Sequence, residues 1–467
     1  MDLQETKDMV YRCNKCGLCI STCPVYQQIL MEAASPRGKV QLIKSFLEGD
    51  VELSNRFKEI ILTCLLCENC VVNCPSGVRH DHVFTDLRTE LVKRYGLNWK
   101  KRLIYGLLMN EKLLHSSSVL AKLGRNWLLE IFAKGMRIGN IPVGRLPKLN
   151  PKPFRDRFDG VILPEGEAKG RVFYFTGCFT NYFAGDVGQA MVNVLKKLQL
   201  QIEIPSHQDC CGIAAILSGE GDIPLKNVEK NISMLTREEI DAVLVDCATC
   251  GAAFKKEYIA LLKRKGMDIK QAEILKGKTY DIMEYIAERI HLLPLRKNGD
   301  GSKIRVTYHD PCHLVRAQGV SEAPRKILKA LPQVEFVEME DANMCCGGGG
   351  SFQFDYPKVS KGITDNKIKK IRDTRASVVV TGCPGCRVTI GGNMNDNDQI
   401  SVLHPIQLVD LAITDEVSEE SLSLKRLTKN IHNCFLILFS SKPSPSALIH
   451  PAYRKDHWAG LLPKGLL

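Results

Sequence analysis

The sequence predicts an α + α/β protein, in which a helical N-terminal domain precedes two copies of an α/β unit. Three observations favour this fold class. At 467 residues the chain is long enough for about three domains of roughly 150 residues each. Apolar residues recur at helical spacing near the N-terminus, whereas strand-like and helical segments alternate from about residue 170. Cysteines in the second half recur at a nearly fixed interval, which indicates a tandem duplication.

The composition is that of an ordinary globular protein apart from its cysteines. Hydrophobic residues make up 44% and charged residues 25% of the chain, which argues against collagenous, disordered and integral-membrane proteins. The first residues carry acids and lysine rather than an apolar leader, and no apolar run reaches the roughly 18 residues of a membrane span. We therefore expect a cytoplasmic protein. In a reducing compartment its 19 cysteines are expected to be metal ligands or redox groups rather than disulfides.

Residues 1–90 are predicted to form the first domain, organised by two matching cysteine runs. Each run has the spacing C-x2-C-x2-C-x3-C followed by proline: Cys13, Cys16, Cys19 and Cys23 before Pro24, and Cys64, Cys67, Cys70 and Cys74 before Pro75. This spacing is typical of two [4Fe-4S] clusters, each held by three cysteines of one run and the fourth of the other. One cluster would use Cys13, Cys16, Cys19 and Cys74, and the second Cys64, Cys67, Cys70 and Cys23. The alternative is a pair of structural zinc sites, which more often use two separated cysteine pairs.

The segment between the two runs has a helical pattern. Apolar residues in 37–49 and 54–64 recur at intervals of three and four. This favours an α-helical ferredoxin over the compact, β-rich kind.

Residues 91–168 are predicted to be a basic connector made of amphipathic helices. Between 91 and 150, twelve lysines and arginines stand against Glu111 and Glu130, with Trp99 and Trp127 among the apolar residues. We expect either a solvated linker or a surface that docks onto an acidic partner or onto the anionic inner face of the membrane. Nucleic acid is not an expected partner, because no recognised binding module accompanies the charge.

Residues 169–300 and 301–415 are predicted to be the two α/β units. Each has a single cysteine, an adjacent pair and a C-x2-C pair: Cys178, Cys210, Cys211, Cys247 and Cys250 in the first unit, and Cys312, Cys345, Cys346, Cys383 and Cys386 in the second. Equivalent cysteines lie 134 to 136 residues apart. Each single cysteine and each C-x2-C pair follows a predicted strand, and α/β sheets bind their ligands at the carboxyl ends of strands. The cysteines of a unit are thus expected to converge on one crevice.

Residues 416–467 follow neither pattern. They contain several prolines and serines and show no sustained period, so an irregular tail without an assigned function is predicted. Cys434 is expected to be an incidental thiol.

The motifs together resemble a known family over residues 1–415. Two proline-terminated cysteine runs, followed by two units with C-C-G and C-x2-C, resemble the iron–sulfur oxidoreductases with duplicated cysteine-rich "CCG" domains. That family includes the iron–sulfur subunits of glycolate and lactate dehydrogenases (the glycolate oxidase type), of anaerobic glycerol-3-phosphate dehydrogenase and of heterodisulfide reductase, whose catalytic subunit this chain also resembles.

The resemblance implies a set of cofactors. In that family the N-terminal motifs bind two [4Fe-4S] cubanes, which maps onto the eight cysteines of the first domain. The CCG domains of heterodisulfide reductases carry non-cubane [4Fe-4S] clusters on five cysteines each, which maps onto the two five-cysteine sets. Both C-x2-C pairs are intact here, which favours one or two such clusters. Zinc in a CCG domain is the alternative, because thiolates suit zinc as well.

Other residues near the cysteines are candidates for supporting roles. Gly347 to Gly350 lack the partners of a phosphate-binding or dinucleotide-binding loop and are expected to pass close to a cluster. Five polar residues could either carry protons near a cluster or only orient loops and strand ends: His207, Asp209, His309, Asp310 and His313.

These observations predict an oxidoreductase subunit rather than a self-sufficient enzyme. The sequence has no complete nucleotide-binding fingerprint and no recognisable nucleophile and base, so a flavoprotein partner carrying FAD is expected. We expect the electron-transfer subunit of a flavin-dependent 2-hydroxyacid dehydrogenase, of the glycolate or lactate type, that passes electrons to quinone or another carrier. One alternative is a heterodisulfide-reductase-like subunit whose CCG cluster cleaves a disulfide. A second is a two-cubane relay with zinc-bound structural CCG domains.

Overall fold

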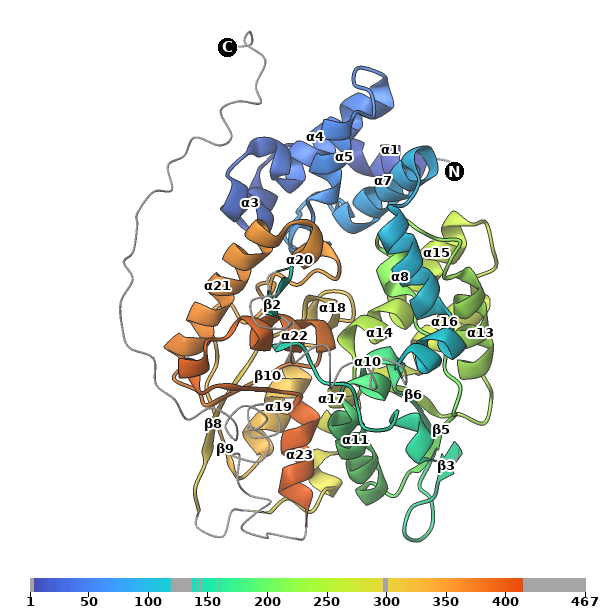
Figure 1. The fold of residues 1–467 in the computed structure, drawn as a ribbon, viewed down its shortest axis with the longest axis vertical. Coiled ribbons are helices and arrows are strands. Elements are labelled where there is room, and N and C mark those ends of the chain that lie inside the picture. Colours follow the sequence, from blue (N-terminus) through green and yellow to red (C-terminus); the bar gives the residue numbers. More distant parts are fainter. Residues whose placement is uncertain are drawn as a thin grey trace. The chain divides into compact units, whose positions relative to one another are not determined.

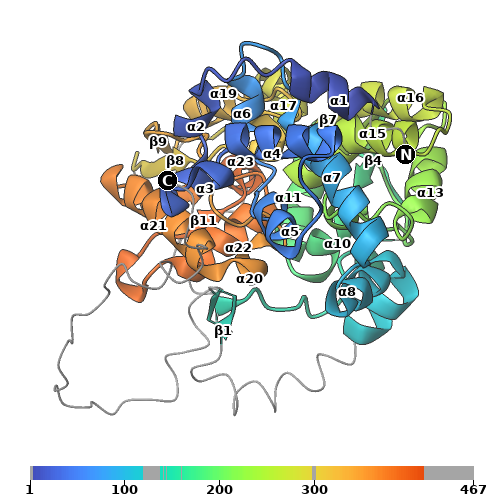
Figure 2. The same cartoon turned by 90° about the horizontal axis from the view of Figure 1, so that it is seen from above.

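The computed structural model describes residues 4–118, 137–139, 141–142, 145–158, 160–296 and 301–414. Predictions for the tail 416–467, for Cys434 and for Trp127 lie outside these residues. Within the described ranges, no helix is long and apolar enough to cross a membrane. Figures 1 and 2 show the fold from two directions.

The N-terminal domain consists of short helices, as predicted. They are α1 (Gln4–Tyr11), α2 (Leu18–Ser21), α3 (Pro24–Ile29), the 3-10 turn η1 (Glu32–Ala34), α4 (Pro36–Glu48), α5 (Asn55–Leu62), α6 (Asn69–Val72) and α7 (His80–Tyr95). Helix α4 starts where the Ser35 hydroxyl accepts a hydrogen bond from the Gly38 amide, with Pro36 in its first position. It ends at Gly49, whose φ of 86° closes the helix. The apolar faces of α4, α5 and α7 form one core.

The described first part of the connector is helical. Helix α8 (Trp99–Met109) is followed by a helical stretch over 111–118. The end of α8 packs on the first α/β unit, where the Asn227 side chain donates to the Met109 carbonyl at 3.1 Å. Further on lie a two-residue antiparallel pair, β1 (Arg137–Ile138) and β2 (Ile141–Pro142), and the 3-10 turn η3 (Arg155–Arg157).

The first α/β unit contains a five-stranded sheet in the order β3-β5-β4-β6-β7. Its strands are β3 (Gly160–Ile162), β4 (Arg171–Phe175), β5 (Gln201–Ile204), β6 (Ala242–Val245) and β7 (Thr279–Asp281). All pairs are parallel except β3 with β5. The helices are α10 (Gly177–Tyr182), α11 (Gly185–Lys197), α12 (Ile213–Ile216), α13 (Leu225–Leu235), α14 (Ala248–Ala252), the π-helical turn η4 (Ala253–Glu257), α15 (Tyr258–Arg264), α16 (Lys270–Lys278), α17 (Ile282–Ala287) and η5 (Ile290–Leu292).

The second unit contains a four-stranded parallel sheet in the order β11-β10-β8-β9. Its strands are β8 (Ile304–Tyr308), β9 (Val334–Phe336), β10 (Val378–Val380) and β11 (Ser401–Leu403). The helices are α18 (Cys312–Val315), α19 (Glu322–Ala330), α20 (Phe352–Asp355), α21 (Pro357–Asp373), α22 (Pro384–Asn393), η6 (Asp396–Asp398) and α23 (Pro405–Ile413).

The two sheets have the same topology, which confirms the predicted duplication. The order β5-β4-β6-β7 in the first unit matches β9-β8-β10-β11 in the second. In each unit the second parallel strand in the sequence lies on one side of the first, and the third lies on the other side. The strand order therefore reverses between β4 and β6 in the first unit and between β8 and β10 in the second. A crevice at such a reversal is where α/β sheets bind ligands. The single cysteine and the C-x2-C pair follow these two strands in each unit.

Candidate metal centres

One pocket of the N-terminal domain brings together three cysteines of the first run and the last cysteine of the second. Its lining includes Cys13, Cys16, Cys19 and Cys74. The loop reaches this arrangement through left-handed residues at Lys15 and Gly17, with φ of 61° and 85°. Burial raises the pKa of Cys19 to about 11, whereas the side of the pocket formed by Cys16 is exposed to solvent. The set therefore has a buried side at Cys19 and a solvent-exposed side at Cys16, where a partner could bind.

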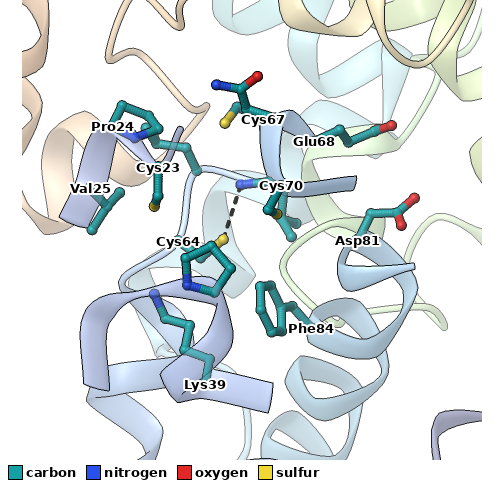
Figure 3. Close-up of a pocket in the computed structure, with 14 residues that line it drawn as sticks. Cys23, Pro24, Val25, Lys39, Cys64, Cys67, Glu68, Cys70, Asp81 and Phe84 are labelled. Carbon is teal, nitrogen blue, oxygen red and sulfur yellow. Dashed lines mark hydrogen bonds between the residues drawn. The ribbon is translucent and has the colours of Figure 1, made fainter. Parts of the chain in front are cut away.

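The neighbouring pocket contains the complementary set (Figure 3). Its cysteines are Cys23, Cys64, Cys67 and Cys70. Burial raises the pKa of Cys23 and, more strongly, that of Cys70. The Leu66 amide donates to the Cys64 sulfur at 3.4 Å. The fourth cysteine of each run therefore lies with the triplet of the other run, the crossed arrangement that the spacing predicts.

A buried lysine lines this second pocket. Lys39 on α4 is 1% exposed, and its ammonium donates to the carbonyls of Ala34 and Thr63, both at 2.7 Å. Burial lowers its pKa, and the nearby sulfurs of Cys64 and Cys23 act in the opposite direction. Sequence reasoning missed Lys39. Its position on the apolar face of α4, next to Val40 and four residues before Ile43, was the available signal.

The first α/β unit brings its five cysteines into one chain of thiol contacts at the sheet reversal. Cys178 opens α10 after β4, and Cys247 precedes α14 after β6. The contacts run Cys178 to Cys210, Cys210 to Cys211, Cys211 to Cys250 at 3.5 Å, and Cys250 to Cys247. Hydrogen bonds from Cys210 and Cys250 lower the pKa of Cys211 to about 6. The predicted convergence on one crevice is therefore observed.

The second unit repeats this chain in the same order. The contacts run Cys312 to Cys345, Cys345 to Cys346, Cys346 to Cys386 at 3.3 Å, and Cys386 to Cys383. A hydrogen bond from Cys386 lowers the pKa of Cys383 to about 6. Equivalent cysteines thus occupy equivalent places in the two sets.

The glycine run beside the second set passes close to its sulfurs. The Gly347 amide donates to the Cys345 sulfur at 3.5 Å, and Gly347 has a φ of 89°. A Cβ atom at Gly348 would lie 2.5 Å from the Thr389 hydroxyl, so a side chain does not fit. The glycine run therefore lies where its backbone N–H groups could donate to the sulfurs of a cluster, as predicted.

The donor chemistry of all four sets fits iron–sulfur clusters or zinc. Each set is four or five thiols, and soft thiolates prefer these metals. Thiols that face one another in a buried crevice are unfavourable as free anions, and a metal cation removes that penalty. The single cysteines, the C-C pairs and the C-x2-C pairs supply the sulfurs that such a centre needs.

The second cysteine set of the N-terminal domain lies next to the set of the second α/β unit. Cys67 and Cys345 belong to one buried cluster with Leu65 and Phe352. The Arg316 guanidinium links the two loops, because it donates to the Cys67 carbonyl at 2.9 Å and to the Asn343 carbonyl at 2.5 Å.

The two α/β sets also meet through their C-x2-C loops. The Thr249 hydroxyl lies 3.4 Å from the Cys383 sulfur, and the Ala248 amide donates to the Gly382 carbonyl at 2.9 Å. The sets of Cys67, Cys345 and Cys250 are thus connected in that order by direct contacts between their loops.

Of the five candidate polar residues, three support loops or face solvent, and two lie near the cysteine sulfurs. Asp310 forms two hydrogen bonds with Arg325, at 3.0 and 2.7 Å, and Asp209 pairs with Lys230 at 3.1 Å. The His207 side chain is 82% exposed. These three residues support loops or face solvent.

His309 is buried near the second set, and His313 beside it is half-buried. Burial lowers the pKa of His309 to about 3 and that of His313 to about 4, so both rings are neutral near pH 7. The His313 ring lies 3.3 Å from the Thr249 hydroxyl.

A further ionic link joins the N-terminal domain to the first α/β unit. Lys256, in the π-helical turn η4, pairs with Glu68 and Asp81 at 2.6 Å each. Glu68 and Asp81 also line the pocket of Cys67 and Cys70. No pattern in the sequence indicated this link, because Lys256 and its two partners lie in different domains and far apart in the sequence.

Comparison with known proteins assigns both parts of the chain. Residues 9–78 match the family described as 4Fe-4S dicluster domain. Residues 172–255 and 306–391 each match the cysteine-rich domain family CCG.

Several known proteins are similar over most of the chain. A fumarate reductase (CoM/CoB) subunit of Methanothermobacter marburgensis is 29% identical over 89% of this chain and 74% of its own length. The probable glycolate oxidase iron–sulfur subunit of Bacillus subtilis is 28% identical over 86% of this chain and 93% of its own. A subunit of the dihydromethanophenazine:CoB–CoM heterodisulfide reductase of Methanosarcina mazei is 27% identical over 88% and 94%. All three are named as subunits of oxidoreductases.

Proposed function

Because the chain belongs to the iron–sulfur oxidoreductase family that joins a 4Fe-4S dicluster domain to two cysteine-rich CCG domains, we propose that it is the electron-transfer subunit of a flavin-dependent 2-hydroxyacid dehydrogenase. The substrate class is glycolate or lactate. The observation that carries this proposal is the connected series of four thiol sets, from the exposed Cys16 to the partly exposed Cys178. The similarity to the glycolate oxidase subunit supports the substrate class.

The residues would hold the clusters as follows. Cys13, Cys16, Cys19 and Cys74 would bind one cubane, and Cys23, Cys64, Cys67 and Cys70 the second. Cys178, Cys210, Cys211, Cys247 and Cys250, and Cys312, Cys345, Cys346, Cys383 and Cys386, would bind one further metal centre each. Bound iron–sulfur clusters exchange one electron each, at potentials that their surroundings set.

The protein supports this function by burying the cysteine sets and holding them close to one another. The loops of Cys67 and Cys345 are held together by Arg316 and by apolar side chains, which exclude water between them. Among the described cysteines Cys16 is the one classed as exposed, so its pocket offers a partner the most accessible side of the series. We place the flavoprotein, with its FAD, on that side.

Reconstitution with the flavoprotein tests this function. Substrate-dependent reduction of a quinone analogue by the flavoprotein should rise when the anaerobically purified chain is added. A chain with Cys67→Ser should lose the increase, because the second cubane pocket would lose a ligand. If the wild-type chain gave no increase with either glycolate or lactate, the proposal would be wrong.

Helix α8 supports contact with an anionic membrane surface. Trp99, Leu103, Ile104 and Leu113 are 53 to 70% exposed on and just after this helix. Five exposed cations lie on α8 or near it in the sequence: Lys93, Arg94, Lys100, Arg102 and Lys112. Exposed apolar side chains together with cations are typical of helices that lie in the lipid interface. The end of α8 contacts the first CCG domain, so this contact would bring that domain to the membrane.

Vesicle binding tests the membrane contact. The chain should co-sediment with phosphatidylglycerol vesicles more than with phosphatidylcholine vesicles, and salt should weaken binding. Leu103→Glu should reduce binding. Leu163→Glu, at a residue that is 65% exposed outside α8, is the matched control. Absence of binding, or equal effects of both substitutions, would contradict the contact, and binding of the flavoprotein through Leu103 would point to a protein partner.

A second candidate function is disulfide reduction. Both C-x2-C pairs are intact and lie in complete five-thiol sets, and the heterodisulfide reductase subunit is similar along most of the chain. On this hypothesis the reduced protein should be reoxidised by a disulfide, and Cys386→Ser should abolish that reaction. Reoxidation by quinone analogues but not by disulfides would exclude it.

A further inference from the structure

A histidine stands among the sulfurs of the second CCG domain. His309 directly follows β8 and is fully buried. One of its ring nitrogens and the sulfurs of Cys346 and Cys386 all lie within 4.8 Å of one another. Two ligands of one metal ion, each about 2.0 to 2.3 Å from it, are at most roughly 4.6 Å apart. The three atoms are therefore close to the separation that a shared ion requires.

The ring of His309 has no other use in the described structure. Neither ring nitrogen has a hydrogen-bond partner of normal geometry among the described residues, although both are buried. The backbone of Ala342 is a near neighbour of the His309 ring. Histidine ligands usually direct their second nitrogen to a backbone carbonyl or a carboxylate. The backbone of Ala342 would be that partner if His309 bound a metal. A buried imidazole without partners is otherwise unfavourable.

The fold itself does not require a histidine at this place. Cys312 and Cys178 lie 134 residues apart, and so do His309 and Phe175. Phe175 is therefore the equivalent residue of the first unit, where its ring packs edge-on against Phe254 with centroids 4.8 Å apart. The first CCG domain thus has an apolar ring where the second has an imidazole, next to otherwise equivalent cysteines.

We propose that His309 is a nitrogen ligand of the metal centre in the second CCG domain, binding the same ion as Cys346 and Cys386. This rests on the proposed function only in assuming that this domain holds a metal centre. The first CCG domain would have a centre ligated by sulfur alone. The nitrogen would be an additional ligand that the first centre lacks, so the two centres would differ in potential.

Histidine labelling with nitrogen-15 and pulsed EPR test the ligand directly. The reduced chain should show a strong coupling to a directly bound nitrogen that changes with nitrogen-15 labelling. His309→Phe, which copies the first domain, should remove that coupling and change one potential while the iron content stays the same. His404→Asn is the matched control, because His404 is equally buried and its ring caps α23.

The outcomes separate this inference from the proposed function. If iron is complete in all centres but the coupling is absent, weak or unchanged in His309→Phe, His309 is not a ligand. If metal analysis finds zinc in this domain, X-ray absorption at the zinc edge should show an imidazole that His309→Phe removes, and sulfur alone would overturn the proposal. If the domain binds no metal, both the His309 proposal and the metal assignment fail, whereas the first two outcomes overturn the His309 proposal alone.

Discussion

At the scale of single residues, the fourth cysteine of each run is the decisive one. Pro24 begins α3 directly after Cys23, so that cysteine leaves its own triplet and points to the pocket of Cys64. Cys74 makes the reciprocal exchange. This crossing was predictable, because spacing and proline fix the direction of the chain locally.

Double substitutions should reveal the crossing. Cys13→Ser with Cys74→Ser should cost about four iron atoms per chain, since both residues would serve one cluster, whereas Cys13→Ser with Cys23→Ser should cost about eight. Anaerobic iron analysis with EPR measures the loss. The reverse pattern, with about eight iron atoms lost in the Cys13 and Cys74 variant and about four in the Cys13 and Cys23 variant, would mean that each run binds its own cluster.

Lys39 should tune the cluster beside it. Removal of a buried positive charge makes reduction harder, so Lys39→Met should lower the potential of one cubane. A unit charge some 7 Å away in an effective dielectric constant of about 20 is worth roughly 2 kcal/mol, or on the order of 100 mV. Potentiometric EPR titration measures it, with Lys44→Met on the same helix as the control. Equal potentials in the wild type and Lys39→Met would show that Lys39 has only a packing role.

At the scale of elements, the pattern of the sequence predicted the strands that carry the cysteines. β4, β6, β8 and β10 are short apolar runs that end near a cysteine, and all four were expected. The edge strands β3, β7 and β11 were not, because none of them is an apolar run that leads to a cysteine, the signal that marked the other four. β7 also follows α16 without a turn residue between them.

The cap of α17 should make stability depend on pH. One carboxylate oxygen of Asp281 accepts from the Met283 amide at 2.9 Å, while the other is buried without a hydrogen-bond partner. Burial raises the pKa of Asp281 to about 7. A carboxyl group whose pKa is higher in the folded state stabilises the protein below its unfolded pKa, near 4, and this stabilisation is lost as pH rises through about 7.

The midpoint of thermal unfolding, measured anaerobically, should therefore fall between pH 5 and pH 8 by more in the wild type than in Asp281→Asn. The asparagine keeps an acceptor for the Met283 amide but cannot ionise. Parallel pH profiles for the two proteins would contradict a buried, titrating Asp281.

At the scale of the whole molecule, packing between domains joins the cysteine sets. The sequence predicted each set from its spacing, but nothing in the sequence indicated that Cys67 lies beside Cys345 or that Thr249 reaches Cys383. Such contacts depend on the surfaces that the folded domains present to one another. Lys256 escaped prediction for the same reason.

Arg316 should be important for the junction between the N-terminal domain and the second CCG domain. Arg316→Leu would remove both hydrogen bonds that tie the Cys67 and Asn343 loops together. We expect unchanged iron content, weaker magnetic interaction between the two centres and slower flavoprotein-dependent quinone reduction. Arg305→Leu, at an exposed pair with Glu335, is the control. An unaltered interaction and rate would show that apolar packing alone holds the junction.

We propose that the four thiol sets form four redox centres in one chain. A reductive titration of the anaerobically purified protein, with metal analysis of the same sample, tests it most directly. We expect about 16 iron atoms per chain and the uptake of about four electrons, with EPR signals of both cubane and non-cubane type. About eight iron atoms, two electrons and bound zinc would contradict it and leave a two-cubane relay with structural CCG domains.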